Sequence, residues 1–101
     1  MNEELKHWFL YIILCSDDCL YTGITTDIDR RWKEHSGDLK KGAKFFRGRK
    51  PKEILYVEFF ENRSEASQRE YSIKKLSRSN KLLVISSKDN QIGEFEYLNS
   101  I

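Results

Sequence analysis

Two short runs of aromatic and β-branched residues, separated by three polar residues, restrict the fold of this chain more than any other feature. The runs are Trp8–Cys15 and Leu20–Thr25, and Ser16, Asp17 and Asp18 lie between them. Such residues favour strands, and the short polar segment favours a tight turn. The sequence therefore predicts a β-hairpin.

The length of the hairpin loop decides which side chains share a face of the sheet, because side chains alternate between the two faces along each strand. A two-residue loop would place Tyr11 and Tyr21 on opposite faces. A three-residue loop, with Asp18 in the left-handed region, pairs Ile13 with Tyr21 and Tyr11 with Gly23, so that both tyrosines share one face. Gly23 either allows a close approach of backbone or substrate, or marks a bulge.

A short helix is predicted over 26–36, and its side chains divide into two faces. The inward face holds three residues at helical spacing: Ile28, Trp32 and His35. Arg31 lies at the edge of this face, whereas Arg30 points almost opposite to it. The two adjacent arginines are therefore expected to have different roles.

The rest of the chain predicts one more strand and two more helices. The elements are a basic loop over 37–52, a strand over 53–60, a helix from 64 to about 77, and a short helix over 80–87. Thr26 or Asp27 is expected to cap the first helix, and Asn62 or Ser64 the long one. The last segment would also suit a strand, because it contains adjacent valine and isoleucine residues.

The size and composition of the chain indicate one domain over 1–101, with its informative part at about 8–85. Its 101 residues, 39% of them apolar, can bury a core without disulfides. Cys15 and Cys19 do not suggest a disulfide framework or a four-ligand zinc site, and we interpret them as small buried hydrophobic residues. No apolar run approaches the roughly 20 residues of a membrane helix, and the N-terminus lacks a basic signal-peptide head. A cytoplasmic protein without a membrane partner is expected.

Basic residues concentrate in two segments, although the net charge is only +2. The segment from 40 to 52 contains no acid, and the second segment spans 74–81. The expected nucleic-acid contacts are Lys40, Lys41, Lys44, Arg47, Arg49 and Lys50. Such segregation is typical of a phosphate-binding face, and equally of a solvated loop and helix face. Phe45 and Phe46, in the first segment, either stack on bases or belong to the core.

Glu70 is a carboxylate on the inward face of the long predicted helix, where Ala66 and Ile73 also lie. Burial of an unpaired carboxylate costs several kcal/mol, about the strength of a good ion pair in the interior. Glu70 is therefore expected to pair with an arginine, Arg69 or Arg31, to extend its carboxylate to the surface, or to serve a functional site.

Five residues occur at a spacing that resembles a known family. Tyr11, Tyr21 and Arg31 follow at ten-residue intervals, His35 lies one helical turn later, and Glu70 is on the next long helix. With FLY at 9–11 and YTG at 21–23 in place of the two family motifs, the chain resembles the GIY-YIG endonuclease superfamily, and in particular its small stand-alone bacterial branch.

This resemblance implies an α+β fold, with a three-stranded antiparallel sheet flanked by helices, and a divalent-metal-dependent DNA endonuclease of DNA repair or of branched or damaged DNA. Glu70 would hold one Mg²⁺ or Mn²⁺, and Tyr21 would accept the proton of the attacking water. Arg31 would stabilise the developing charge, while Tyr11 and His35 orient the reacting groups.

The sequence also leaves a different function open. The same five residues would persist in a non-catalytic nucleic-acid-binding accessory module that keeps the fold. RNA is not excluded as a substrate, and the sequence indicates no protein partner. The chain departs from the family at Phe9, where the motif has glycine, and at Ile24, where some relatives, including the incision nuclease of nucleotide excision repair, carry a lysine that assists the site.

Overall fold

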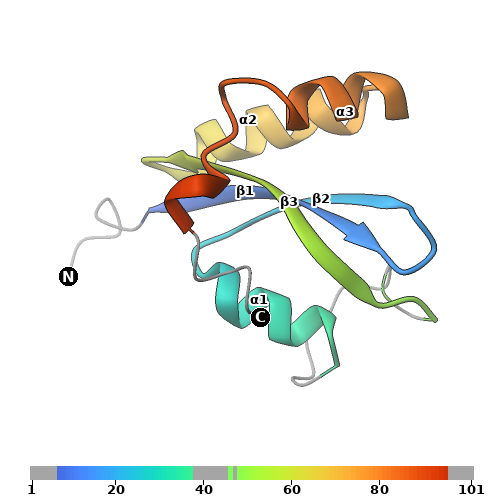
Figure 1. The fold of residues 1–101 in the computed structure, drawn as a ribbon. Helices are drawn as coiled ribbons and strands as arrows, with labels where there is room; N and C mark the ends of the chain where they lie inside the picture. Colours follow the sequence, from blue (N-terminus) through green and yellow to red (C-terminus); the bar gives the residue numbers. More distant parts are fainter. Residues whose placement is uncertain (1–6, 38–45, 47, 96–101) are drawn as a thin grey trace.

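The protein folds into a three-stranded antiparallel sheet with strand order β2-β1-β3 and with helices on both of its faces (Figure 1). The computed structural model describes residues 7–37, 46 and 48–95. The elements are β1 (Trp8–Cys15), β2 (Leu20–Thr25), α1 (Ile28–His35), β3 (Pro51–Phe60), α2 (Arg63–Lys74) and α3 (Arg78–Ile85). The α+β architecture implied by the family resemblance is confirmed. Within the described ranges, no helix is long and apolar enough to cross a bilayer.

The hairpin of β1 and β2 has the predicted three-residue loop. Tyr11 pairs with Gly23, and Ile13 pairs with Tyr21. Asp18 adopts a φ of 68°, in the left-handed region that aspartate tolerates. Because the register fixes which face each side chain occupies, Tyr11 and Tyr21 lie on the same face, and their ring centroids are 6.2 Å apart.

Each helix begins at a polar residue whose side chain accepts a hydrogen bond from the backbone N–H three residues later. These N-cap residues are Asp27 for α1, Asn62 for α2 and Ser77 for α3. α2 ends at Lys74, short of the expected end near Ser77, because Ser77 starts the next helix. The final segment is helical, which excludes the strand alternative.

Alternate residues of β1 face two different cores. The core on the α1 side contains Tyr11, Ile13, Cys15, Ile28, Phe46, Ile54 and Val57. The core on the side of α2 and α3 contains Leu10, Ile12, Tyr56 and Ile73. Cys15 is buried as expected, whereas Cys19 is only partly buried at the end of the hairpin, and both thiols are free.

The outer edge of β3 is bonded by the segment that follows α3. Nδ2 of Asn90 donates to the carbonyl of Leu55 at 2.9 Å, and its Oδ1 accepts from the N–H of Val57 at 3.2 Å. The side chain of Gln91 accepts from the N–H of Phe59 at 2.7 Å, and its own N–H donates to the carbonyl of Val57 at 2.8 Å. This segment therefore takes the place that a fourth strand would occupy.

Candidate active site

Tyr11 and His35 form the centre of the candidate site. Oη of Tyr11 lies 2.9 Å from Nε2 of His35, in a hydrogen bond that joins β1 to the end of α1. The two residues are only 2% and 4% exposed. The helical pattern placed His35 on the inward face of α1, and the structure agrees.

Burial keeps both members of this pair neutral near pH 7. It lowers the pKa of His35 to about 4, with the charge of Arg31 acting in the same direction and that of Glu34 against it. Burial raises the pKa of Tyr11, and the charge and hydrogen bond of Arg31 offset this only in part. Arg31 can only donate to the phenol oxygen, and the same hydroxyl bonds Nε2 of His35, where the tautomer of the imidazole decides which of the two groups donates.

Arg31 is held by a carboxylate that the sequence analysis did not single out. Its Nη1 donates to Oε1 of Glu34 at 2.6 Å, and the Glu34 side chain is 10% exposed. Burial alone would lower the pKa of Arg31, but the interactions with Glu34 and Tyr11 raise it. The guanidinium therefore stays charged and fixed beside Tyr11. The available sequence signal was the i, i+3 spacing of the two residues.

Arg30 does not point away from Arg31 as the helical pattern indicated. Its Nη2 lies 3.5 Å from Oγ1 of Thr25, and its Nε lies 3.6 Å from the carboxylate of Glu34. The side chain is still 49% exposed. A long arginine side chain can bend back toward a buried charge, so the direction of Cβ does not fix the position of its guanidinium.

Two further rings pack around the histidine. The ring of Phe46 lies 4.3 Å from that of His35, and the ring of Tyr21 lies 5.2 Å from it, measured between centroids. Phe46 is buried, so it belongs to the core rather than serving as a stacking surface. Phe45 lies outside the described residues. Tyr21 is half-buried, in contrast to Tyr11.

The glycine of the second motif makes room for the first tyrosine. A Cβ atom built on Gly23 would lie 2.5 Å from Oη of Tyr11 and 2.7 Å from its Cζ. The close approach suggested by the sequence is therefore made by the protein's own side chain. Gly23 lets the Tyr11 hydroxyl lie over β2, at the edge of the sheet.

Glu70 lies on α2, between the fully buried Ala66 and Ile73, and its own side chain is 22% exposed. Its carboxylate is 3.1 Å from Nζ of Lys74, one turn further along the helix. The negative charge of Glu70 contributes to the raised pKa of Tyr11, after the larger effect of burial. Glu70 thus acts electrostatically on Tyr11 from α2, which packs on the other face of the sheet.

The arginines expected as partners of Glu70 are engaged elsewhere. Arg69 bonds to Glu58 at 3.1 Å, and Arg31 bonds to Glu34. Of the alternatives left open for Glu70, the arginine ion pair is thus replaced by an ion pair with Lys74. The lysine one turn ahead is closer, and its flexible side chain is half-exposed, so the pair can open at little cost.

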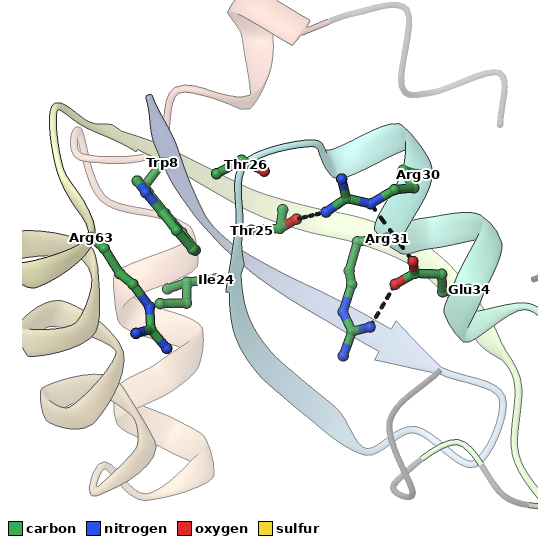
Figure 2. Close-up of a pocket in the computed structure, with 8 residues that line it drawn as sticks. All are labelled: Trp8, Ile24, Thr25, Thr26, Arg30, Arg31, Glu34 and Arg63. Carbon is green, nitrogen blue, oxygen red and sulfur yellow. Dashed lines mark hydrogen bonds and ion pairs between the residues drawn. The ribbon is translucent and has the colours of Figure 1, made fainter. Parts of the chain in front are cut away.

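A cleft of about 490 Å³ opens beside Arg31, between α1 and the start of α2 (Figure 2). Its lining residues are Trp8, Ile24, Thr25, Thr26, Arg30, Arg31, Glu34 and Arg63. Ile24, which replaces the lysine of some relatives, contributes an apolar part of this lining. The sequence analysis did not single out Trp8 or Arg63.

The basic segment is described only in part. Lys40, Lys41, Lys44 and Arg47 lie outside the described residues. Nε of Arg49 is 3.0 Å from the carboxylate of Asp17, so this arginine is engaged in an ion pair. Lys50 is exposed, and its backbone bonds to Ser16 in the hairpin loop.

One face of the three-stranded sheet gathers two tyrosines, an arginine and a histidine, and the glutamate on α2 acts electrostatically on one of the tyrosines. This fold and site define a nuclease-type domain. Comparison with known proteins agrees. The model of the GIY-YIG catalytic domain family matches residues 7–82, and the chain belongs to this family.

Its relatives are short proteins of similar extent. The UPF0213 protein CPE1444 of Clostridium perfringens is 48% identical over 87% of this chain and 92% of its own length. The UPF0213 protein DP2720 of Desulfotalea psychrophila is 48% identical over 81% of this chain and 74% of its own length. The solution NMR structure of the UPF0213 protein BH0048 from Bacillus halodurans has a TM-score of 0.54 and 39% identity, with 93% of each chain covered. The small stand-alone branch expected from the sequence is thereby confirmed.

The donor groups of the site fit a hard divalent cation of the kind that GIY-YIG nucleases generally use. Among the described residues, no three His, Cys, Asp or Glu side chains gather into a metal-binding group. A cation held by Glu70 would therefore have this one carboxylate and otherwise water and substrate oxygens. Mg²⁺ accepts such a set because it keeps most of its waters and often binds through one or two carboxylates and a phosphate.

Proposed function

We propose that this protein is an endonuclease that hydrolyses phosphodiester bonds in DNA with the help of one divalent cation, in repair or in the processing of branched or damaged DNA. The observation that carries the proposal is the position of Arg31. Its fixed guanidinium lies beside the neutral Tyr11–His35 pair and lines an open cleft. The free thiols of Cys15 and Cys19 are compatible with the cytoplasmic setting we infer for this activity.

In the proposed reaction, the half-buried Tyr21 receives the proton of the attacking water, directly or as a relay. Tyr11 is not suited to this role, because burial raises its pKa and its hydroxyl is bonded to the buried His35. The neutral His35 fixes the direction of the Tyr11 hydroxyl. Arg31 donates to the non-bridging oxygens as negative charge builds on them.

Glu70 would hold the divalent cation, which when bound supplies a Lewis acid that stabilises the leaving oxygen. The ion pair with Lys74 is half-exposed on the lysine side, so Lys74 can move away when a cation arrives. Without the cation, Lys74 keeps the Glu70 carboxylate neutralised on a largely buried helix face.

The decisive test is a cleavage assay on linear, flapped, branched and single-stranded DNA, and on RNA, with and without Mg²⁺ or Mn²⁺. Glu70→Gln keeps the shape of the side chain but removes the anionic ligand, so metal affinity and cleavage should fall together while DNA binding in chelator persists.

Tyr21→Phe should also abolish cleavage, whereas Tyr71→Phe, on the exposed side of α2, should not. Glu70→Gln protein that is folded and cleaves at the parent rate would end the metal proposal. DNA binding without cleavage in the parent protein would instead indicate the accessory module.

Arg31→Ala should lower the cleavage rate by about 10²-fold or more, as expected for loss of a donor to developing charge. Arg30→Ala removes a half-exposed guanidinium that shares Glu34 with Arg31. It should mainly weaken DNA binding and have the smaller effect at saturating substrate. Single-turnover kinetics on both variants will test this difference, and equal losses of the cleavage step would contradict the role given to Arg31.

The lysines and arginines of the basic segment are proposed to bind the DNA backbone. Lys50 is suited to this test because its side chain is exposed, and Lys44 adds a second position. The double substitution to alanine should flatten the slope of log affinity against log salt by roughly two units without changing the chemical step. An unchanged slope would show that these residues are solvated charges that do not contact phosphates.

A further inference from the structure

We propose that the cleft between α1 and α2 binds one unpaired nucleotide of the DNA strand that is cut. Its base would stack on Trp8, and its phosphate would contact Arg63 and Arg30. This inference rests on the proposed function, because it identifies single-stranded DNA next to the cleaved bond as the substrate class. It assigns binding roles to Trp8 and Arg63, which take no part in the reaction described above.

The two walls of the cleft differ in chemistry (Figure 2). On the α1 side, Arg30 and Arg31 converge on Glu34. On the α2 side, Arg63 lies against the ring of Trp8, with Ile24 next to it. The volume of about 490 Å³ is within the range of roughly 300–1,000 Å³ in which proteins bind small organic groups.

The charge of the cleft favours an anion. Three arginines line it, against one glutamate. Arg63 is the first residue of α2, where a cation meets the positive end of the helix dipole and is disfavoured. In the part of the chain that the structure describes, no carboxylate lies within ion-pair distance of Arg63. A phosphate at this position would offset the guanidinium charge that the positive end of the helix dipole disfavours.

The aromatic wall favours a base. The guanidinium carbon of Arg63 is 5.5 Å from the centroid of the Trp8 ring, so the face of the indole is covered by a planar, exposed cation rather than by packed core residues. Nucleic-acid bases stack on both tryptophan rings and arginine planes. A base entering the cleft can therefore stack on the indole while Arg63 turns toward the adjoining phosphate.

The cleft selects unpaired nucleotides because a base within a duplex has both faces covered by its neighbours. Only a strand end, a flap or a gap leaves a base free to enter. Arg31 belongs both to the cleft and to the candidate active site. The bound nucleotide would thus lie directly next to the phosphate that is hydrolysed.

Binding can be measured in chelator, where cleavage does not occur. The chain has two tryptophans, Trp8 and Trp32. In a Trp32→Phe background, the remaining fluorescence comes from Trp8 alone. We expect quenching by a short single-stranded oligothymidine and by a duplex with a single-stranded extension, and little change with a blunt duplex. Unchanged Trp8 fluorescence with all three probes would overturn the proposal.

Variants separate the base contact from the phosphate contact. Trp8→Ala should weaken binding of the extended duplex about tenfold and leave the salt slope unchanged, as expected for lost stacking. Tyr71→Ala is the matched control, because Tyr71 also carries a cation over its ring, that of Lys75 at 4.0 Å, but lies outside the cleft. Equal binding by these two variants would contradict a role for Trp8.

Arg63→Ala should weaken binding and reduce the salt slope by roughly 0.7, the value for one phosphate contact on a single strand. Lys88→Ala removes one exposed charge outside the cleft and should leave the slope unchanged. An unaltered slope in Arg63→Ala would overturn the phosphate contact, and it does so even if Trp8→Ala has failed to fold. If the parent protein cuts no substrate but Trp8 is quenched, the proposed nuclease function fails while the nucleotide site stands.

Discussion

The two faces of the sheet share the central strand β1 and both carry apolar cores, but the α1 face adds a buried tyrosine–histidine pair. On the side of α2 and α3, Leu10 and Ile12 pack with Tyr56 and Ile73 in a mostly aliphatic core. On the α1 side, Tyr11, from the same strand, meets a buried histidine. Adjacent residues of β1 therefore lie in two different environments: Leu10 and Ile12 are packed among apolar side chains, and Tyr11 between them is bonded to a histidine.

The difference shows how a small domain can hold buried polar groups. Apolar side chains on both faces supply hydrophobic stabilisation. The polar groups of the α1 face are tolerable because they bond to one another or to Glu34 and are neutral where they are most buried. The faces should therefore respond differently to substitution. The four tests below compare them, in order of decreasing effect on the free energy of unfolding.

Ile73→Ala should give the largest loss of stability, about 2–5 kcal/mol, because Ile73 is fully buried on the aliphatic face and its removal leaves a cavity. Urea unfolding measures the loss. Cleavage per folded molecule should change little, because Ile73 faces away from Tyr11. Leu83→Ala, at a side chain that is 65% exposed on α3, is the control and should stay within about 0.5 kcal/mol. Similar losses in both variants would show that burial of Ile73 in the core on the α2 side does not provide the expected stabilisation.

Gly23→Ala should cost about 1–3 kcal/mol, because the new methyl group would overlap the buried ring and hydroxyl of Tyr11. It should also reduce cleavage by displacing this hydroxyl from His35. Gly93→Ala is the control, since nothing lies within 4 Å of the corresponding position. A Gly23→Ala protein of parent stability would mean that Tyr11 moves aside freely, and thus that the polar face is less rigid than we describe.

Acid should destabilise the polar face through His35. Between pH 6.5 and about 4, the unfolded histidine binds a proton that the folded one excludes, so stability falls as the pH falls. The slope from this group is at most about 1.4 kcal/mol per pH unit. It should be missing in His35→Gln and retained in His7→Gln, because His7 is exposed. Parallel stability curves for the parent and His35→Gln proteins would contradict the neutral histidine.

Thr22→Val should have the smallest effect and the opposite sign. Oγ1 of Thr22 is buried and, among the described residues, has no hydrogen-bond partner, so a valine of the same shape should be neutral or stabilise by up to about 1 kcal/mol. Thr25→Val, in the same strand, breaks hydrogen bonds with Asp27 and should destabilise. Thermal melts of the pair give the comparison, and a destabilised Thr22→Val protein would reveal a partner for that hydroxyl.

The sequence was most informative where local rules act. Alternation of side chains and the tolerance of Asp18 for the left-handed region were enough to predict the pairing of Tyr11 with Gly23. Capping preferences limited the N-caps to Thr26 or Asp27 and to Asn62 or Ser64, and the structure selects Asp27 and Asn62. Strand β3 begins at Pro51, two residues before the expected start, because proline is tolerated as the first residue of an edge strand.

Interactions between distant or flexible groups were not predictable in this way. The pattern could bring His35 to the inward face, but not show that its partner is Tyr11. Arg30 bends back to Glu34 because its side chain is long, which a projection of Cβ directions ignores. Phe46 could not be assigned to the core or to base stacking until its contact with His35 was known.

Asn90 and Gln91 have a consequence for the behaviour of this protein in a concentrated solution. An edge strand with unpaired backbone groups is a template on which another chain can add a strand and begin an aggregate. On β3, the groups of Leu55, Val57 and Phe59 are already bonded by these two side chains and their backbone. The sheet is thus closed to growth on this side by residues of its own chain, and a chain shortened before residue 90 would lose that protection while keeping all three strands.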